Sequence, residues 1–173
     1  MRREIDPVLS ELDKLLFGRG GKIEMLSPMI ANLLQQLDEA PALPQAWQPL
    51  GDEFLDIKFP SDVVSAWLFA LRGNGKFPGE RHPNSWQRSI ALRGRALFEV
   101  YSDGSWQQHQ LVGAGRIAQE RTISIPHGMW HRIAIGPDPF VSLSFHTAPA
   151  AELIEDTCEN DDFSRIHSRL YQG

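Results

Sequence analysis

The sequence contains little cysteine, no long apolar run and no concentration of basic residues. A single cysteine, Cys158, among 173 residues excludes an internal disulfide and any cysteine-based zinc or iron–sulfur centre. No apolar stretch approaches the ~20 residues that a membrane-spanning helix needs. No apolar segment follows the arginines near the N-terminus, so a secretory signal is not expected. These absences predict a protein of the reducing cytoplasm, without a membrane partner.

The charge is modest and evenly spread. The formal net charge is −5, and lysine and arginine are dispersed rather than gathered into a stripe. Nucleic-acid binding through phosphate neutralisation needs clustered positive charge, so nucleic acid is not an expected partner. Hydrophobic residues make up 42% and charged residues 23%, which is typical of a folded globular chain. A small molecule is the partner that this composition leaves open.

Residues 1–50 are expected to form a helical extension. Asp6 is placed to cap a helix over residues 5–17, with Pro7 at its first position. Ser27 is the expected cap of a second amphipathic helix over residues 27–37. The glycine cluster at 18–21 follows a helix and lacks the Lys-Ser/Thr pair of a P-loop, so it favours a helix stop.

Residues 51–173 are expected to form a single β domain. Strands are predicted over 63–71, 89–101, 122–126, 131–135 and 140–146, separated by turns rich in Gly, Pro, Asn and Asp. Residues 148–162 are expected to begin with a short helical turn, and 166–171 to form a last edge strand. Short strands at near-regular spacing favour a jelly roll. The predicted fold class is mainly β, a jelly-roll β-barrel preceded by two short helices.

Two stretches of this body resemble the paired signatures of the cupin superfamily. Residues 126–131, Pro-His-Gly-Met-Trp-His, fit the pattern Pro-x-Gly-x-x-His and end at His131. The other stretch reads Glu80-x-His82-x4-Gln87-x6-Gly94, with Glu80 where the family has a histidine and Gln87 where it has a glutamate. A rival register through His82-x-Asn84 needs a shorter gap than the family shows. The resemblance implies a cupin jelly-roll barrel.

Within that superfamily the chain resembles cysteine dioxygenase and related thiol dioxygenases. The resemblance rests on the two N-terminal helices, the two motifs, the strand 141–149 and the segment 167–169. That family holds Fe(II) with three histidines, which implies Glu80, His82 and His131 as the metal ligands here. Two histidines and a carboxylate suit Fe(II), and Mn or Zn are alternatives. Residues two apart face the same side of a strand, so Glu80 and His82 can point together.

The expected site departs from the family at several positions. Gln87 stands where the family's crosslinking cysteine falls, and His146 and Ser144 stand where it has a tyrosine and a histidine. No arginine aligns with the family's carboxylate-binding residue, and Lys58 is only a loose candidate. Gln87 and His146 are the expected catalytic residues, with His146 as a proton donor or substrate contact.

Four residues are expected to contact the substrate. Ser142 and Ser144 share the face of His146 on one strand, which suits a polar barrel interior. The alternative is that this face is exposed to solvent. Trp86 and Trp130 each neighbour a candidate site residue and can line the pocket, or they can simply pack in the core.

The sequence therefore leaves two main hypotheses for the function and a third, weaker one. The first is a metal-dependent, cysteine-dioxygenase-like oxidoreductase that acts with dioxygen on a small polar substrate, thiols included. The alternative is a non-catalytic, metal-free cupin that binds a small ligand, in which Glu80 is a solvated turn residue and the histidines are hydrogen-bonded barrel residues. The third is a metal-independent isomerase with His82 or His146 as base. A homodimer is the expected assembly.

Overall fold

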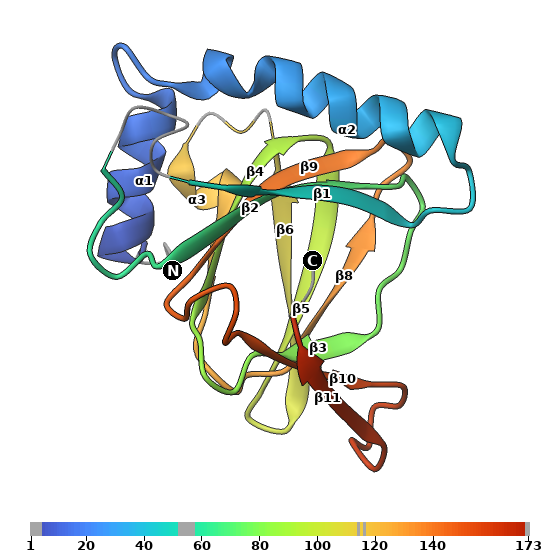
Figure 1. Cartoon of the computed structure of the whole chain (residues 1–173). Helices are drawn as coiled ribbons and strands as arrows, with labels where there is room; N and C mark the ends of the chain where they lie inside the picture. The colour runs from blue at the N-terminus through green and yellow to red at the C-terminus, as the bar shows by residue number, and fades with distance from the viewer. Residues whose placement is uncertain (1–4, 52–57, 114, 116, 172–173) are drawn as a thin grey trace.

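Two facing β-sheets with helices against one of them make up the chain (Figure 1). The computed structural model describes residues 5–51, 58–113, 115 and 117–171. Helix α1 (Pro7–Phe17), the 3-10 helix η1 (Ile23–Leu26) and helix α2 (Ser27–Glu39) precede the strands. The predicted class, mainly β with two helices in front, is confirmed.

The two helices begin differently. Asp6 caps α1 as predicted, because its Oδ1 accepts hydrogen bonds from the backbone N–H of Val8 at 2.8 Å and of Leu9 at 3.4 Å. The prediction that Ser27 caps α2 is wrong. Helix η1 runs directly into α2, so Ser27 is already the first helical residue, and Leu26 precedes it in helical conformation without a side-chain cap.

The chain passes repeatedly from one sheet to the other, and all the described strand pairings are antiparallel. The five-stranded sheet has the order β1 (Gln45–Leu50), β2 (Ser65–Leu71), β9 (Phe140–His146), β4 (Gln87–Arg93) and β7 (Thr122–Ile125). The six-stranded sheet has the order β11 (Ile166–Leu170), β10 (Ile154–Cys158), β3 (Gly79–Arg81), β8 (His131–Ile135), β5 (Arg95–Ser102) and β6 (Ser105–Val112). A short helix, α3 (Ala118–Arg121), precedes β7. Among the described residues, backbone pairing does not close the two sheets into one continuous barrel.

Several predicted strands are confirmed, and others were missed. The strand predicted over 89–101 is divided at Gly94, whose φ of 78° turns the chain from β4 in one sheet to β5 in the other. The turn expected after Ala148 is present, closed by a hydrogen bond from Glu152 N to Pro149 O at 3.0 Å. The sequence did not predict β1, β6 or β10.

The central strands of the five-stranded sheet, β2, β9 and β4, are largely buried on both faces. On β9, Val141, Leu143 and Phe145 pack with the apolar faces of α1 and α2, which lie across this sheet in Figure 1. The alternate residues of β9, including Ser142 and Ser144, point between the sheets. All seven residues of β9 are buried, so the face of His146 is not exposed to solvent.

Among the described helices, none is long and apolar enough to cross a bilayer.

Candidate metal centre

Neighbouring strands of the six-stranded sheet bring Glu80, His82 and His131 together. Glu80 on β3 is the direct cross-strand partner of His131, the first residue of β8. His82 follows β3, and its carbonyl accepts a 2.9 Å hydrogen bond from the N–H of Gly128 in the other motif. One ligand atom from each of the three side chains lies within 4.8 Å of the other two. The two sequence motifs therefore lie side by side.

The backbone orients both imidazoles in the same way. His82 Nδ1 lies 3.0 Å from the carbonyl of Ile154, and His131 Nδ1 lies 3.2 Å from that of Met129. A carbonyl oxygen only accepts, so Nδ1 donates in each ring, and in a neutral ring Nε2 keeps its lone pair. His131 Nε2 faces Glu80 Oε1 at 3.1 Å. If His131 is protonated, this contact is an ion pair. If His131 is neutral, the lone pair of its Nε2 and the Glu80 carboxylate face each other, an arrangement that suits a cation between them.

The donor set fits a divalent ion. Ligands about 2.1 Å from one ion are at most about 4.2 Å apart, so a pair of atoms at the 4.8 Å limit would have to close by at least about 0.6 Å when an ion binds. An Nδ1–H held by a backbone carbonyl is the usual second-shell support of a metal-binding histidine. Two nitrogens and one carboxylate oxygen suit Fe(II), Mn or Zn.

Burial and neighbouring charges set the protonation of these groups. Burial opposes ionisation of Glu80, but the hydrogen bond from His131 and the charges of both histidines lower its pKa below the usual value. Burial lowers the pKa of His82, although the Glu80 charge acts in the other direction. Glu80 is therefore ionised and His82 neutral near pH 7, and these are the forms that bind a metal.

A small cavity adjoins two of the three candidate ligands, Glu80 and His131. It has a volume of about 70 Å³, and Glu80, His131, Gln87, Ser142 and Ser144 are among the residues that line it. Five of the residues singled out in the sequence thus surround one space between the sheets. The cavity is partly open, and its polar residues face apolar ones such as Phe69, Phe77 and Phe98, a mixed lining that suits a small ligand.

His146 lies beside this group, deep in the same interior. Its Nε2 is 3.0 Å from Ser144 Oγ, and its ring centroid is 4.9 Å from that of His82. Burial, and then the charges of His82 and His131, hold the pKa of His146 well below the usual value, so the ring is neutral at pH 7. Among the described residues, His146 Nδ1 and Gln87 Oε1 are buried without a hydrogen-bond partner.

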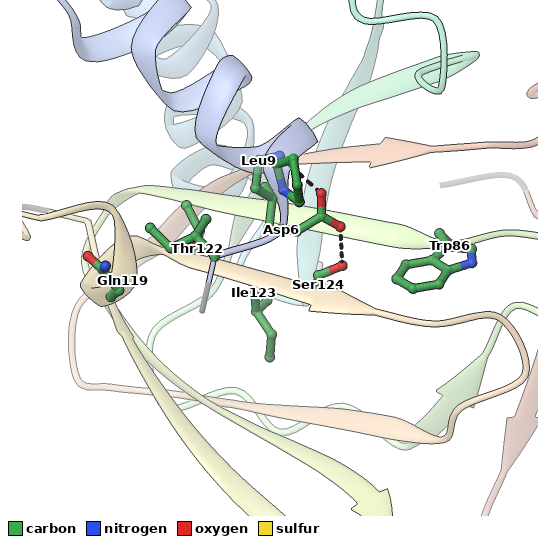
Figure 2. A pocket seen from close by; sticks show the side chains of 9 residues that line it. Asp6, Leu9, Trp86, Gln119, Thr122, Ile123 and Ser124 are labelled. Atoms are coloured by element: carbon green, nitrogen blue, oxygen red, sulfur yellow. Dashed lines mark hydrogen bonds between the residues drawn. The ribbon is translucent and has the colours of Figure 1, made fainter. Parts of the chain in front are cut away.

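The structure does not bring Trp86 or Trp130 into the cavity. Trp86 lines a separate hollow beside the start of α1, together with Asp6 and Ser124 (Figure 2). Trp130 stacks on Phe163 with ring centroids 5.0 Å apart. Lys58 lines another hollow with Leu50 and Phe59. Asn84, from the rival register, binds the backbone of residues 152 and 154 with its side-chain amide.

Two lining residues were missed by sequence reasoning. Glu155 on β10 is 3% exposed, its carboxyl group is hydrogen-bonded to that of Glu80, and Arg169 Nε lies 2.6 Å from its Oε2. Burial, and then the charge of Glu80, raise the pKa of Glu155. Tyr171, just after β11, contacts His82 and Trp67 edge-on, with centroid distances of 5.4 and 5.3 Å. No motif covers either residue, so the sequence held no signal for them.

Comparison with solved structures identifies the fold. The pro-11S globulin of pumpkin matches with a TM-score of 0.51 and 17% identity, over 66% of this chain and 28% of that one. The coconut allergen cocosin matches with a TM-score of 0.50 and 18% identity, over 66% and 28%. Procruciferin, an 11S globulin from Brassica napus, matches with a TM-score of 0.51 and 21% identity, over 68% and 29%. The chain has a cupin fold.

At this level of identity the comparison establishes the cupin fold alone. The chain spans less than a third of the length of these globulins. No protein-family model matches the sequence, and a search of curated proteins found no match. The fold alone does not identify a function, so the functional evidence lies in the chain's own residues.

Proposed function

We propose that this cupin is a metal-dependent oxidoreductase that holds Fe(II) with Glu80, His82 and His131 and acts with dioxygen on a small polar substrate of the thiol class. The observation that carries the proposal is the convergence of two oriented imidazoles and one carboxylate beside a small cavity with several polar lining residues. The likeness of the motifs to the thiol dioxygenases supports the choice of Fe(II) over Mn or Zn.

A redox-active divalent ion supplies the one-electron chemistry that makes dioxygen reactive toward a small molecule. The chain's own residues have simpler tasks. Ser142, Ser144 and Gln87 line the cavity and can orient the substrate through hydrogen bonds. His146 is neutral and buried with Nδ1 unpaired, so it can contact the substrate there, whereas its lowered pKa opposes uptake of a proton. The rings of Tyr171 and Trp67 pack against His82 and His146 and exclude water from them.

The first test is the metal content of protein purified without a chelator or a histidine tag, measured by mass spectrometry. We expect about one ion per chain after anaerobic Fe(II) loading, lost in His131→Ala and in Glu80→Ala. His127→Ala is the matched control, because His127 is exposed in the turn that precedes His131. Iron-loaded protein should then consume dioxygen when a small thiol is added, as followed with an oxygen electrode.

The alternative is a metal-free cupin that binds a small ligand in the same cavity. Two observations favour it: Gln87 replaces the glutamate of the cupin motif, and His131 and Glu80 can satisfy each other as an ion pair. Absence of metal after Fe(II) loading, in folded protein, would overturn the oxidoreductase and leave this alternative.

A further inference from the structure

We infer that the ring of Tyr171 is a movable wall, which separates His82 and His146 from the cavity until the C-terminal strand β11 leaves its partner β10. The inference goes beyond the proposed function, because it concerns only the access of a ligand to these two imidazoles and holds with or without a metal. Neither sequence motif contains Tyr171, which enters the space between the sheets directly after the end of β11.

Tyr171 contacts both the cavity and the two histidines that do not line it. It is one of the lining residues, whereas His82 and His146 are not among the described residues that line the cavity. Its ring centroid lies 5.4 Å from that of His82 and 6.0 Å from that of His146. In this arrangement only two of the candidate ligands, Glu80 and His131, face the cavity. Removal of the Tyr171 ring would join the cavity to the space beside the other two imidazoles.

The cavity has little room while this ring is in place. Its volume of about 70 Å³ corresponds to roughly two water molecules, so a ligand of more than a few non-hydrogen atoms does not fit inside it. Phe69 and Ser142 belong to β2 and β9, which have a paired strand on each side, so their part of the wall is fixed. Tyr171 follows an outermost strand and is the lining residue that can move with the least disruption of the sheets.

Strand β11 is attached to the molecule at few points. Among the described strands it pairs with β10 alone, and all five of its residues are exposed, Leu170 by 56%. Arg169 binds Glu155, but the arginine is 62% exposed. The apolar attachment is Tyr171 itself, which packs edge-on against Trp67 with ring centroids 5.3 Å apart. Segments with few buried apolar contacts and exposed backbone hydrogen bonds open at a lower free energy than the rest of a protein.

Opening also satisfies a polar atom that the closed arrangement leaves unpaired. His146 Nδ1 is buried without a hydrogen-bond partner among the described residues. A buried polar atom without a partner costs roughly 1–3 kcal/mol. Water or a ligand that reaches His146 after the Tyr171 ring has left can bond to this nitrogen. That gain offsets part of the packing lost by Tyr171, so the open arrangement lies closer in free energy to the closed one.

Chemical modification of His146 in the full chain tests the inference. Diethyl pyrocarbonate is too large for the present cavity, and it transfers an ethoxycarbonyl group to a neutral imidazole with release of carbon dioxide and ethanol. Peptide mass spectrometry gives the rate at His146, with exposed His127 as the internal standard. We expect Tyr171→Ala to raise the rate at His146 at least about tenfold relative to His127. Tyr171→Phe keeps the ring and should react as slowly as the unmodified chain.

A disulfide across the hairpin tests the movement of the strand. Ile154 and Leu170 are direct cross-strand partners beside Tyr171, and the Cα spacing of such pairs suits a disulfide. The variant carries Ile154→Cys and Leu170→Cys, with the native cysteine removed by Cys158→Ser. The oxidised protein should be modified at His146 at least about fivefold more slowly than the same protein after reduction.

A third variant separates local opening from unfolding of the whole chain. Leu33→Ala weakens the contact between α2 and the five-stranded sheet, far from β11 in the fold (Figure 1). It should raise the rate at His146 much less than Tyr171→Ala does. Equal rates in the oxidised and reduced disulfide variant, an unchanged rate in Tyr171→Ala, or an equal rise in Leu33→Ala would overturn the inference. Failure of the proposed function is distinct, because it shows as absence of bound metal and leaves these rates unaffected.

Discussion

Asp6 shows how one residue can perform two structural tasks. Its Oδ1 caps α1, while its Oδ2 accepts hydrogen bonds at 2.8 Å from Arg88 of β4 and from Ser124 of β7, the latter drawn in Figure 2. Asp6 and Arg88 are 11% and 9% exposed. The sequence predicted the cap, because capping depends on neighbours in the chain. It held no signal for the ion pair, whose partners are 82 residues apart.

We expect Asp6→Asn to lower the free energy of unfolding by about 2 kcal/mol at pH 7, because asparagine still caps the helix but leaves Arg88 without its counterion. Burial raises the pKa of Asp6, but the hydrogen bonds and charge of its partners outweigh it, so the folded pKa lies below the ordinary 3.8. The stabilisation is therefore complete above that pH and is lost as the pH falls through the folded pKa.

The measurement is urea unfolding of both proteins at pH 7 and at pH 3. The difference between them should shrink at the lower pH. Exposed Asp62, changed to Asn, should alter stability by less than about 0.5 kcal/mol. An equal loss at both pH values would show that the charge of Asp6 is not the cause.

Some residues of the candidate site can be predicted from the sequence, and others cannot. Glu80, His82 and His131 belong to short motifs with fixed spacing, so the sequence alone predicts them as candidate metal ligands. Glu155 and Tyr171 could not, because their place beside Glu80 depends on β10 pairing with β3, across more than seventy residues of chain. Trp86 and Trp130 neighbour site residues in the sequence, but their side chains contribute to other parts of the molecule.

At the scale of elements, Gly94 sets the connection between the two sheets. Its φ is 78°, and a Cβ there would lie 2.4 Å from the carbonyl oxygen of Pro139. Gly104, in the turn between β5 and β6, has nearly the same φ of 79° but open space around it. The two positions therefore differ in steric room and hardly at all in backbone conformation.

We expect Gly94→Ala to destabilise the protein by about 3 kcal/mol or more, because left-handed strain and a backbone clash act together. Gly104→Ala should cost only about 1 kcal/mol, because it introduces the strain alone. Thermal and urea unfolding of the two variants provide the comparison. Equal losses would mean that the close approach of Pro139 is relieved at little cost.

Strands β6 and β10, which the sequence did not predict, escaped prediction for different physical reasons. Strand β6 lies at a sheet edge and is largely exposed, so its residues lack the alternation of buried and exposed positions that marks a strand. Strand β10 is acidic, yet Glu155 and Asp156 are buried because Arg169 and Arg81 pair with them. Such burial depends on partners distant in the sequence, which composition does not reveal.

At the scale of the whole molecule, the helices share an apolar core with the outer face of the five-stranded sheet, and the inner face of that sheet contributes to a second core between the two sheets. Leu9, Leu12 and Leu33 pack in a single cluster with residues of β2 and β9. Polar contacts reinforce it, since Arg121 Nε and one terminal nitrogen bind Asp13 of α1 at 2.6 and 2.8 Å. Arg72 likewise donates to the carbonyls of Ala40 and Leu43 after α2. The division into a helical extension over 1–50 and a barrel over 51–173, like the homodimer, remains a prediction from the sequence.

This shared core predicts that helices and barrel unfold together. The five tryptophans all follow residue 45, so their fluorescence reports on the strands, whereas ellipticity at the helical minimum is dominated by α1 and α2. Leu33→Ala removes a fully buried side chain at the helix–sheet contact, and we expect it to cost about 3 kcal/mol. Both signals should shift to the same lower urea midpoint, as two-state unfolding requires. Met25→Ala, at a 40% exposed position, should shift neither by much. If the ellipticity alone moved to lower urea while fluorescence kept its midpoint, the helices would be an independent unit and the barrel would be stable without them.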